Sequence, residues 1–145
     1  MTLAYLDSSV LVSMALGDSR GMQALAILGS RDAYTSELSA VECQAGLSSS
    51  YAEPRSGLPA AEQVLNAILG RVQMIRITSA VLGQARTLVR RHRSGIGLRT
   101  LDAIHIASCA EVQAEMGGGA IEYITADRRQ HSAFTAEGFA GALLP

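Results

Sequence analysis

Two aspartates follow apolar runs that could place them at the same edge of a sheet. Asp7 comes directly after "LAYL" (3–6), and Asp127 follows "IEYIT" (121–125) after one alanine. Both runs are typical of buried strands, and ligands of open α/β sheets bind beyond the carboxyl ends of the strands. Taken singly, each aspartate could be a helix cap or a turn residue. As a pair, they suggest a ligand site.

A glutamate lies in a segment with helical periodicity. In "ELSAVECQAG" (37–46), an apolar stripe is predicted at i, i+3, i+4 and i+7, formed by Leu38, Val41, Glu42 and Ala45. The stripe places Glu42 toward the core or at the edge of the buried face. A glutamate there can be a satisfied core residue or an edge residue whose stem packs. The other acids favour a functional role.

The fourth acid is set into the apolar segment "TLDAIHIASC" (100–109). Thr100 is the predicted N-cap, which puts Asp102 in the first helical turn. The helix N-terminus favours an anion there by at most about 1 kcal/mol. A lone buried carboxylate is costly and needs a partner. His105 could touch the same rim or act as a general acid, but we expect a packed, hydrogen-bonded histidine.

Convergence of these acids would require a cation. Two like charges about 4 Å apart repel by about 4 kcal/mol at an effective dielectric of about 20. The chain contains no lysine, although an arginine could neutralise the acids. A hard divalent cation such as Mg²⁺ is the more economical partner. We therefore expect Asp102 to be paired with a metal ion rather than with a side chain. Two such ions can activate a water and stabilise the leaving oxygen of a phosphodiester.

Composition describes an ordinary globular chain. Its 145 residues, 48% of them hydrophobic, predict a single domain over 1–145, and a net charge of −1 gives no basic field. Cys43 and Cys109 lie in helical patterns and are expected to be small core residues. The start of the chain is typical of neither a signal peptide nor a membrane span, so we expect a cytoplasmic protein that contacts no membrane.

The expected elements alternate between strands and helices. Strands are predicted at 2–6, 32–36, 71–78, 121–125 and the end of the chain. Helices are predicted at 8–16, 19–29, 37–48, 58–70, 79–93, from 100 to the glycines at 117–119, and in a short segment after 127, with a loop at 48–57. This order predicts an α/β fold with a parallel sheet covered on both faces.

Four stretches together resemble the PIN-domain ribonucleases. They are "YLDSSVLV" around Asp7, "SELSAVEC" around Glu42, "TLDAIHIASC" around Asp102 and "YITADRRQ" around Asp127. They look most like the VapC-like toxins of bacterial type II toxin–antitoxin pairs, and they occur in the expected order. The resemblance implies a three-layer α/β/α sandwich around a central, mainly parallel sheet. It also implies an Mg²⁺- or Mn²⁺-dependent endoribonuclease, a homodimer and a cognate antitoxin protein.

The resemblance also assigns roles to residues. It implies a catalytic, metal-binding set of four acids, formed by the triad Asp7, Glu42 and Asp102 with Asp127 completing it. Ser8 and Thr125 match hydroxyl positions that could orient ligands or water, and Ser8 could equally be a helix cap. In some relatives a further acid follows the fourth, where this chain has Arg128 and Arg129. Whether one or two metal ions bind stays open.

Basic residues near these motifs have two interpretations. The run at 90–93 is typical of a solvated helix end. Together with Arg99, Arg128 and Arg129 it could instead contact the phosphates of an RNA substrate.

Three other functions compete with RNA hydrolysis. A receiver-like binding module also gathers acids at a strand edge, but it would need a lysine that this chain lacks. A catalytically inactive PIN fold is disfavoured because all four acidic positions are filled. A metal-dependent phosphatase differs only in its monoester substrate, and only the family resemblance argues against it. The favoured hypothesis is attack of water on phosphorus, leaving 5′-phosphate and 3′-hydroxyl ends.

Overall fold

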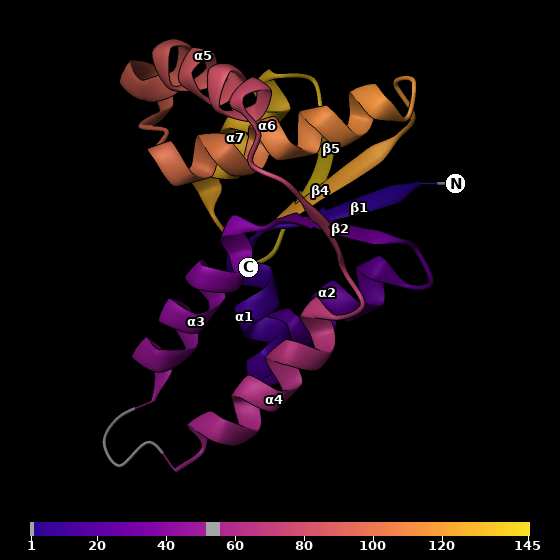
Figure 1. Ribbon diagram of the computed structural model, residues 1–145, viewed down its shortest axis with the longest axis vertical. Helices are drawn as coiled ribbons and strands as arrows, with labels where there is room; N and C mark the ends of the chain where they lie inside the picture. Colours follow the sequence, from indigo (N-terminus) through magenta and orange to yellow (C-terminus); the bar gives the residue numbers. More distant parts are fainter. Residues whose placement is uncertain (1, 52–55) are drawn as a thin grey trace.

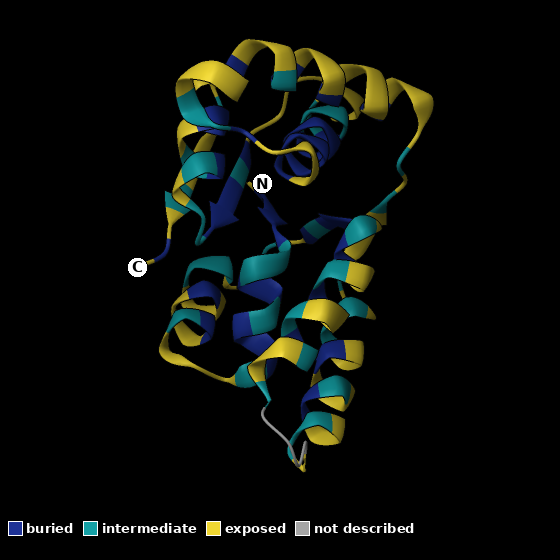
Figure 2. Ribbon diagram, turned by 90° about the vertical axis from the view of Figure 1, so that its left-hand side faces the viewer, coloured by how far each residue is buried: buried dark blue, intermediate teal, exposed yellow. Residues whose placement is uncertain are grey.

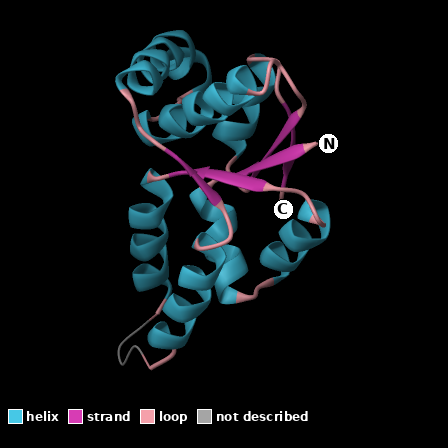
Figure 3. Ribbon diagram, turned by 45° about the vertical axis from the view of Figure 1, so that its right-hand side comes forward, coloured by secondary structure: helices cyan, strands magenta, loops and turns pink. Residues whose placement is uncertain are grey.

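A parallel sheet forms the centre of the computed structural model, which describes residues 2–51 and 56–145. Within these ranges, five strands pair in the order β3-β2-β1-β4-β5, and every pairing is parallel (Figure 3). The strands are β1 (Leu3–Leu6), β2 (Ala33–Ser36), β3 (Gln73–Ile75), β4 (Ile121–Thr125) and β5 (Ala140–Leu143). The predicted parallel sheet is therefore confirmed.

Helices cover both faces of the sheet. They are α1 (Ser8–Leu16), α2 (Ser19–Leu28), α3 (Leu38–Ser50), α4 (Leu58–Leu69), α5 (Ser79–Ile96), α6 (Thr100–Glu115) and α7 (Arg128–Ala136). Figure 1 shows α5, α6 and α7 on one side of the strands and α1 to α4 on the other. The predicted three-layer α/β/α sandwich is confirmed. None of the helices in the described ranges is both long and apolar enough to cross a membrane.

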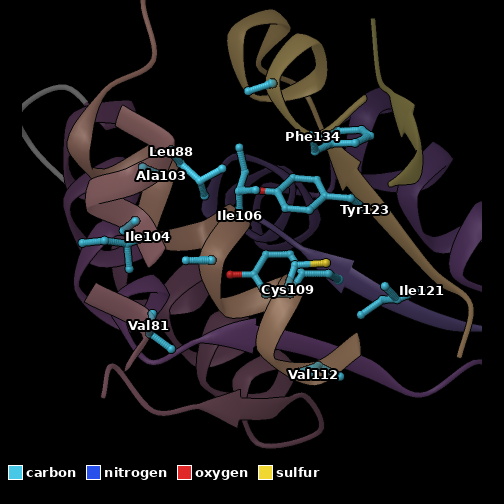
Figure 4. Packing of buried hydrophobic residues seen from close by; sticks show 14 of the residues in the cluster. Val81, Leu88, Ala103, Ile104, Ile106, Cys109, Val112, Ile121, Tyr123 and Phe134 are labelled. Atoms are coloured by element: carbon cyan, nitrogen blue, oxygen red, sulfur yellow. The ribbon is translucent and has the colours of Figure 1, made fainter. Parts of the chain in front are cut away.

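Each face of the sheet has its own hydrophobic core, because successive strand residues point to opposite faces. Tyr5 and Tyr123 pack with α5, α6 and α7, where Phe134 covers Tyr123 (Figure 4). Leu6 and Ile124 pack on the other side with α1, α3 and α4. Burial is concentrated along the strands and the inner helix faces (Figure 2). The central strand β1 therefore reads as a continuous apolar run, as expected for a sheet covered on both sides.

The order of the strands creates a switch point in the middle of the sheet. The chain moves from β1 to β2 and β3 on one side, and it later adds β4 on the other side of β1. Connections therefore diverge between the neighbouring carboxyl ends of β1 and β4. Such switch points are where open α/β sheets bind ligands.

Several sequence-based boundaries were wrong. Thr100 is not the N-cap of α6: the cap is Arg99, and the Asp102 carboxylate accepts its backbone N–H at 3.1 Å. The strand predicted at 71–78 is limited to Gln73–Ile75, at the edge of the sheet.

The loop predicted at 48–57 begins later than expected. Helix α3 continues to Ser50, and the hydroxyls of Ser49 and Ser50 donate to the carbonyls of Ala45 and Gly46 one turn earlier. The remainder of that loop includes 52–55, which lie outside the described residues.

The close approach of α1 and α2 generates a stability prediction. A Cβ atom at Gly21 would lie 2.3 Å from the backbone carbonyl oxygen of Ser13. We expect Gly21→Ala to lower the free energy of unfolding by about 1–3 kcal/mol, the usual cost of overpacking. The control is Gly83→Ala in α5, where a Cβ would meet nothing within 4 Å. It should stabilise by up to about 1 kcal/mol through helix propensity. Urea denaturation measures both, and equal stability of the two variants would contradict the packing argument.

Candidate active site

One pocket of about 440 Å³ opens at the switch point of the sheet. All four acids singled out in the sequence line it, although they come from different elements. The remaining wall residues include Ser8, Ser9, Arg93, Arg99 and Gln130. The structure therefore brings together Asp7, Glu42, Asp102 and Asp127.

Asp7 is the most deeply buried of the acids, with no exposed surface. It caps α1, and its Oδ1 accepts the hydroxyl of Ser9 at 2.7 Å and the backbone N–H of Val10 at 3.2 Å. Its Oδ2 accepts the hydroxyl of Thr125 at 2.6 Å. Burial raises the pKa of Asp7, against the lowering effects of His105 and of these hydrogen bonds. The carboxylate is thus held rigidly at a cost in desolvation.

Of the two hydroxyl residues predicted beside the acids, Thr125 contacts Asp7, whereas Ser8 only lines the pocket. Thr125 lies against Asp7 and also accepts the backbone N–H of Asp127 at 3.0 Å. Ser8 lines the pocket as the first residue of α1, but it is not the cap, and the hydroxyl that contacts Asp7 belongs to Ser9. Sequence reasoning missed Ser9, although a serine two residues after an N-cap aspartate is a common local hydrogen-bond pattern.

Asp102 has side-chain partners, so the expectation that only a metal ion would pair with it was wrong. Its Oδ1 accepts the amide N–H of Gln130 at 3.1 Å, and its Oδ2 lies 3.6 Å from the Nε of Arg99. Burial raises the pKa of Asp102, as does the nearby charge of Asp127, while Arg99 and Gln130 lower it. Gln130 was also missed, although its place three residues after Asp127 puts it in the first turn of α7 beside the pocket.

Asp127 is the N-cap of α7. Its Oδ1 accepts the backbone N–H groups of Arg129 at 2.8 Å and Gln130 at 3.2 Å, and its Oδ2 lies 3.6 Å from a guanidinium nitrogen of Arg99. The side chain is 25% exposed. The capping role and the pocket position therefore coexist in one residue, so the two interpretations of this aspartate were not exclusive.

Glu42 enters the pocket from α3, at the edge of the buried face of that helix. The predicted apolar stripe was wrong: Val41 is 71% exposed, and the residues that pack inward are Ser39, Cys43 and Leu47. The buried face of α3 is thus displaced by about one position from the predicted stripe. Glu42 consequently lies beside the core, with 20% of its side chain exposed.

His105 is the packed, hydrogen-bonded residue that the sequence predicted, with 1% of its surface exposed. Its Nε2 lies 2.5 Å from Oε1 of Glu42, and its Nδ1 lies 2.8 Å from the hydroxyl of Tyr5. It therefore contacts the site from behind Glu42 and does not form part of the pocket wall.

The predicted RNA-contacting arginines are divided between two places. Arg99 lines the pocket with 54% of its side chain exposed, and Arg129 lies 3.8 Å from Asp127. Arg128 instead lines a separate pocket near the end of the chain. Arg93, the last residue of the basic run at 90–93, also faces the acidic pocket.

The donor set suits a hard divalent cation. Carboxylate oxygens are the ligands that Mg²⁺ takes, commonly one or two from the protein with water and phosphate oxygens completing the shell. Among the described residues, no group of three or more Asp, Glu, His or Cys side chains lies in an arrangement that could hold a metal ion as it stands. An ion in this pocket would therefore need water or substrate oxygens to complete its coordination shell.

Comparisons with known proteins agree with this geometry. A family model described as "PIN domain" matches residues 4–134, so the chain belongs to the PIN-domain family. A comparison with curated protein sequences found no match.

Several solved structures share the fold. VapBC2 from Rickettsia felis, bound to a DNA fragment from its promoter, has a TM-score of 0.65 at 15% identity, with 100% of both chains covered. A toxin–antitoxin complex from Klebsiella pneumoniae has a TM-score of 0.64 at 19% identity, covering 89% of this chain and 90% of that one. VapC20 from Mycobacterium tuberculosis, a sarcin–ricin loop cleaving toxin, has a TM-score of 0.60 at 20% identity, covering 94% and 96%.

The burial of Asp7 predicts that its negative charge lowers the stability of the folded protein, although the proposed chemistry needs that charge. Because its pKa is raised in the folded state, its charge opposes folding at neutral pH, and this cost disappears as the pH falls toward its ordinary value of 3.8. Without metal ion at pH 7.5, we expect Asp7→Asn to raise the Tm by about 2–4 °C, as about 1 kcal/mol does in a domain of this size. The asparagine Oδ1 can keep accepting from Ser9 and Val10, and its Nδ2 can donate to the Thr125 hydroxyl, which reverses that hydrogen bond.

Thermal melts from pH 4 to 8 check this prediction. The advantage of Asp7→Asn should shrink steadily on acidification, whereas the exposed variant Asp32→Asn should follow the wild-type protein throughout. If Asp7→Asn is less stable than wild type at every pH, the charge of Asp7 does not destabilise the folded protein, and the prediction is wrong.

Proposed function

We propose that the chain is a metal-dependent endoribonuclease of the toxin type, which hydrolyses RNA by attack of water on phosphorus. The observation that carries this proposal is the convergence of four acids on one pocket at the switch point of a PIN fold. Family membership supports nuclease chemistry, and a structural neighbour described as a toxin that cleaves the sarcin–ricin loop supports RNA as the substrate class.

The chain's own residues would prepare the site for Mg²⁺ or Mn²⁺. The bound ion would polarise the scissile phosphate and lower the pKa of the attacking water. The residues that would hold it are Asp7, Asp102, Asp127 and Glu42. Ser9 and Thr125 fix the Asp7 carboxylate by donating to both of its oxygens, which leaves less reorganisation for the moment of binding.

Water as the nucleophile has a chemical signature. Hydrolysis of the P–O3′ bond leaves a 5′-phosphate and a 3′-hydroxyl, whereas attack by the ribose 2′-hydroxyl would leave a cyclic phosphate. We expect the first pair of ends, because the pocket is dominated by carboxylates that can orient a water molecule.

Cleavage of purified cellular RNA tests the proposal directly. EDTA should abolish cleavage, and Asp102→Asn should slow it by more than about 100-fold, the upper end of what loss of an outer-shell partner costs a metal site. The control is Asp32→Asn, an exposed aspartate outside the acidic pocket. Cleavage that survives EDTA, or that Asp102→Asn retains at the wild-type rate, would refute the proposal.

Arginines at the pocket rim would contact the RNA backbone. Arg99 is largely exposed and lies within reach of both Asp102 and Asp127, so its guanidinium can turn from the acids to a phosphate of the substrate. Arg128 faces a different pocket and should not take part.

This division gives a matched pair of variants. Arg99→Gln should weaken RNA binding and reduce the slope of log affinity against log salt by about 1, the effect of losing one phosphate contact. The same variant should bind Mn²⁺ more tightly, because a competing cation is lost from Asp102 and Asp127. Arg128→Gln should change neither quantity. Fluorescence anisotropy in an Asp7→Asn background measures RNA binding without cleavage, and equal effects of the two arginine variants would contradict the assignment.

Protein partners follow from the same proposal. Two structural neighbours are toxin–antitoxin assemblies by their descriptions, which supports a cognate antitoxin that blocks the acidic pocket, with an arginine as the natural counter-charge. Family resemblance also supports a homodimer. Co-expression with a short overlapping upstream reading frame, followed by light scattering of the purified complex, measures inhibition and stoichiometry together.

A further inference from the structure

Two tyrosines stand side by side behind the acidic pocket. Tyr5 of β1 and Tyr123 of β4 are register partners in the sheet, and both are fully buried. Their rings stack with centroids 4.9 Å apart and planes 22° apart. Tyr123 also stacks on Phe134, which Figure 4 shows within the core beneath α7. The two rings are therefore held by strand pairing and by aromatic packing.

The hydroxyl of Tyr5 leads to Glu42 through one intermediate. Nε2 of His105 lies 2.5 Å from Oε1 of Glu42, and Nδ1 of the same ring lies 2.8 Å from the hydroxyl of Tyr5. These contacts fit the tautomer in which Nε2–H donates to the carboxylate and Nδ1 accepts the tyrosine hydroxyl. The Tyr5 oxygen in turn accepts the backbone N–H of Ser36 at 3.1 Å. With this tautomer, each donor in the hydrogen-bonded series from Ser36 to Glu42 points toward the carboxylate.

The hydroxyl of Tyr123 leads to Asp102 in the same manner. It donates to Oε1 of Gln130 at 2.5 Å, and Nε2 of Gln130 donates to Oδ1 of Asp102 at 3.1 Å. Gln130 is 5% exposed, so water does not replace either contact readily. Because the amide oxygen of Gln130 accepts from Tyr123 and its nitrogen donates to Asp102, the amide has one possible orientation, which fixes the direction of the donated N–H.

Core packing alone does not explain these polar chains. Phenylalanine would fill nearly the same volume as either tyrosine without a hydroxyl to desolvate, and burying an unpaired hydroxyl costs free energy. Two separate series of hydrogen bonds nevertheless begin at paired strand positions, and both end at an acid of the same pocket. In the described part of the chain, no buried side-chain nitrogen or oxygen lacks a hydrogen-bond partner.

We propose that Tyr5 with His105, and Tyr123 with Gln130, are positioning residues that orient Glu42 and Asp102 for binding a divalent cation. Each acid arrives on its own helix, α3 or α6, and its hydrogen-bonded chain ties it to a central strand. The sheet therefore sets the relative placement of the two carboxylates. This inference rests on the proposed metal-dependent function.

Mn²⁺ binding measured by isothermal titration calorimetry tests it without relying on catalysis. His105→Leu and Gln130→Met keep most of the side-chain volume but lose the donated N–H. We expect each to weaken Mn²⁺ binding by about 10–100-fold, as loss of outer-shell partners does elsewhere. His105→Gln retains a donor at the same distance along the side chain and should restore most of the affinity. Tyr123→Phe should show a smaller loss in the same direction.

The chain offers a matched control. His92 of α5 lies 2.5 Å from Glu137, a second histidine–glutamate contact that is outside the acidic pocket. His92→Leu removes that contact and should leave Mn²⁺ affinity unchanged, even where its Tm falls. A loss of affinity in His92→Leu equal to that in His105→Leu would overturn the inference, because general destabilisation would then explain both.

Two further outcomes are distinguishable. Failure of the wild-type protein to bind Mn²⁺ or to cleave RNA refutes the proposed function itself. Wild-type binding together with unchanged affinity in folded Gln130→Met and Tyr123→Phe refutes the positioning role and leaves the proposed function intact. Should His105→Leu fail to fold, these two variants and His105→Gln still decide the question, with circular dichroism confirming their structure.

Discussion

Desolvation of carboxylates that share one pocket is the constraint on which the rest of this structure depends. Burial raises the pKa values of Asp7 and Asp102, so each negative charge opposes folding at neutral pH. The protein offsets this cost with hydrogen-bond donors, because hydroxyls, backbone amides and a glutamine amide surround these two acids. The helix N-terminus at Asp127 and the guanidinium of Arg99 reduce the remaining charge. The pocket therefore keeps a net negative charge, and hydrogen bonds offset part of the free-energy cost of burying it.

The sheet provides the frame that makes this tolerance possible. Parallel strands bring the carboxyl ends of β1 and β4 together, and both faces are covered, so residues just beyond the strands are shielded from water. Donors aimed from such positions act in a low-dielectric environment, where hydrogen bonds to charged groups are strong. The helices bring Glu42 and Asp102 to the same edge, where His105 of α6 and Gln130 of α7 contact them. The site therefore depends on the packing of the helices against the sheet as well as on the strands.

Sequence reasoning located the acids because their positions depend on local signals. A carboxylate after a buried strand, as at Asp7, is visible in a few residues, and the alternation of strands and helices predicted the layers. What the sequence could not supply were partners far apart in the chain, such as His105 against Glu42 or Gln130 against Asp102. Those contacts depend on where the packing of the layers places α6 relative to α3 and α7. The inward face of α3 was also misplaced, because small buried residues such as Ser39 give little periodic signal.

The contrast between the back and the rim of the pocket bears on how such proteins diverge. Behind the acids, side chains are buried and mutually bonded, and a change in one disturbs several others. At the rim, Arg99 is more than half exposed and Arg93 lies on a helix end, so substitutions there meet little steric resistance. Substitutions at the rim of this pocket should therefore be tolerated more readily than substitutions in its interior. Solved structures with 15–20% identity to the chain share its fold, so most of its residues can differ while the layers of the sandwich are kept.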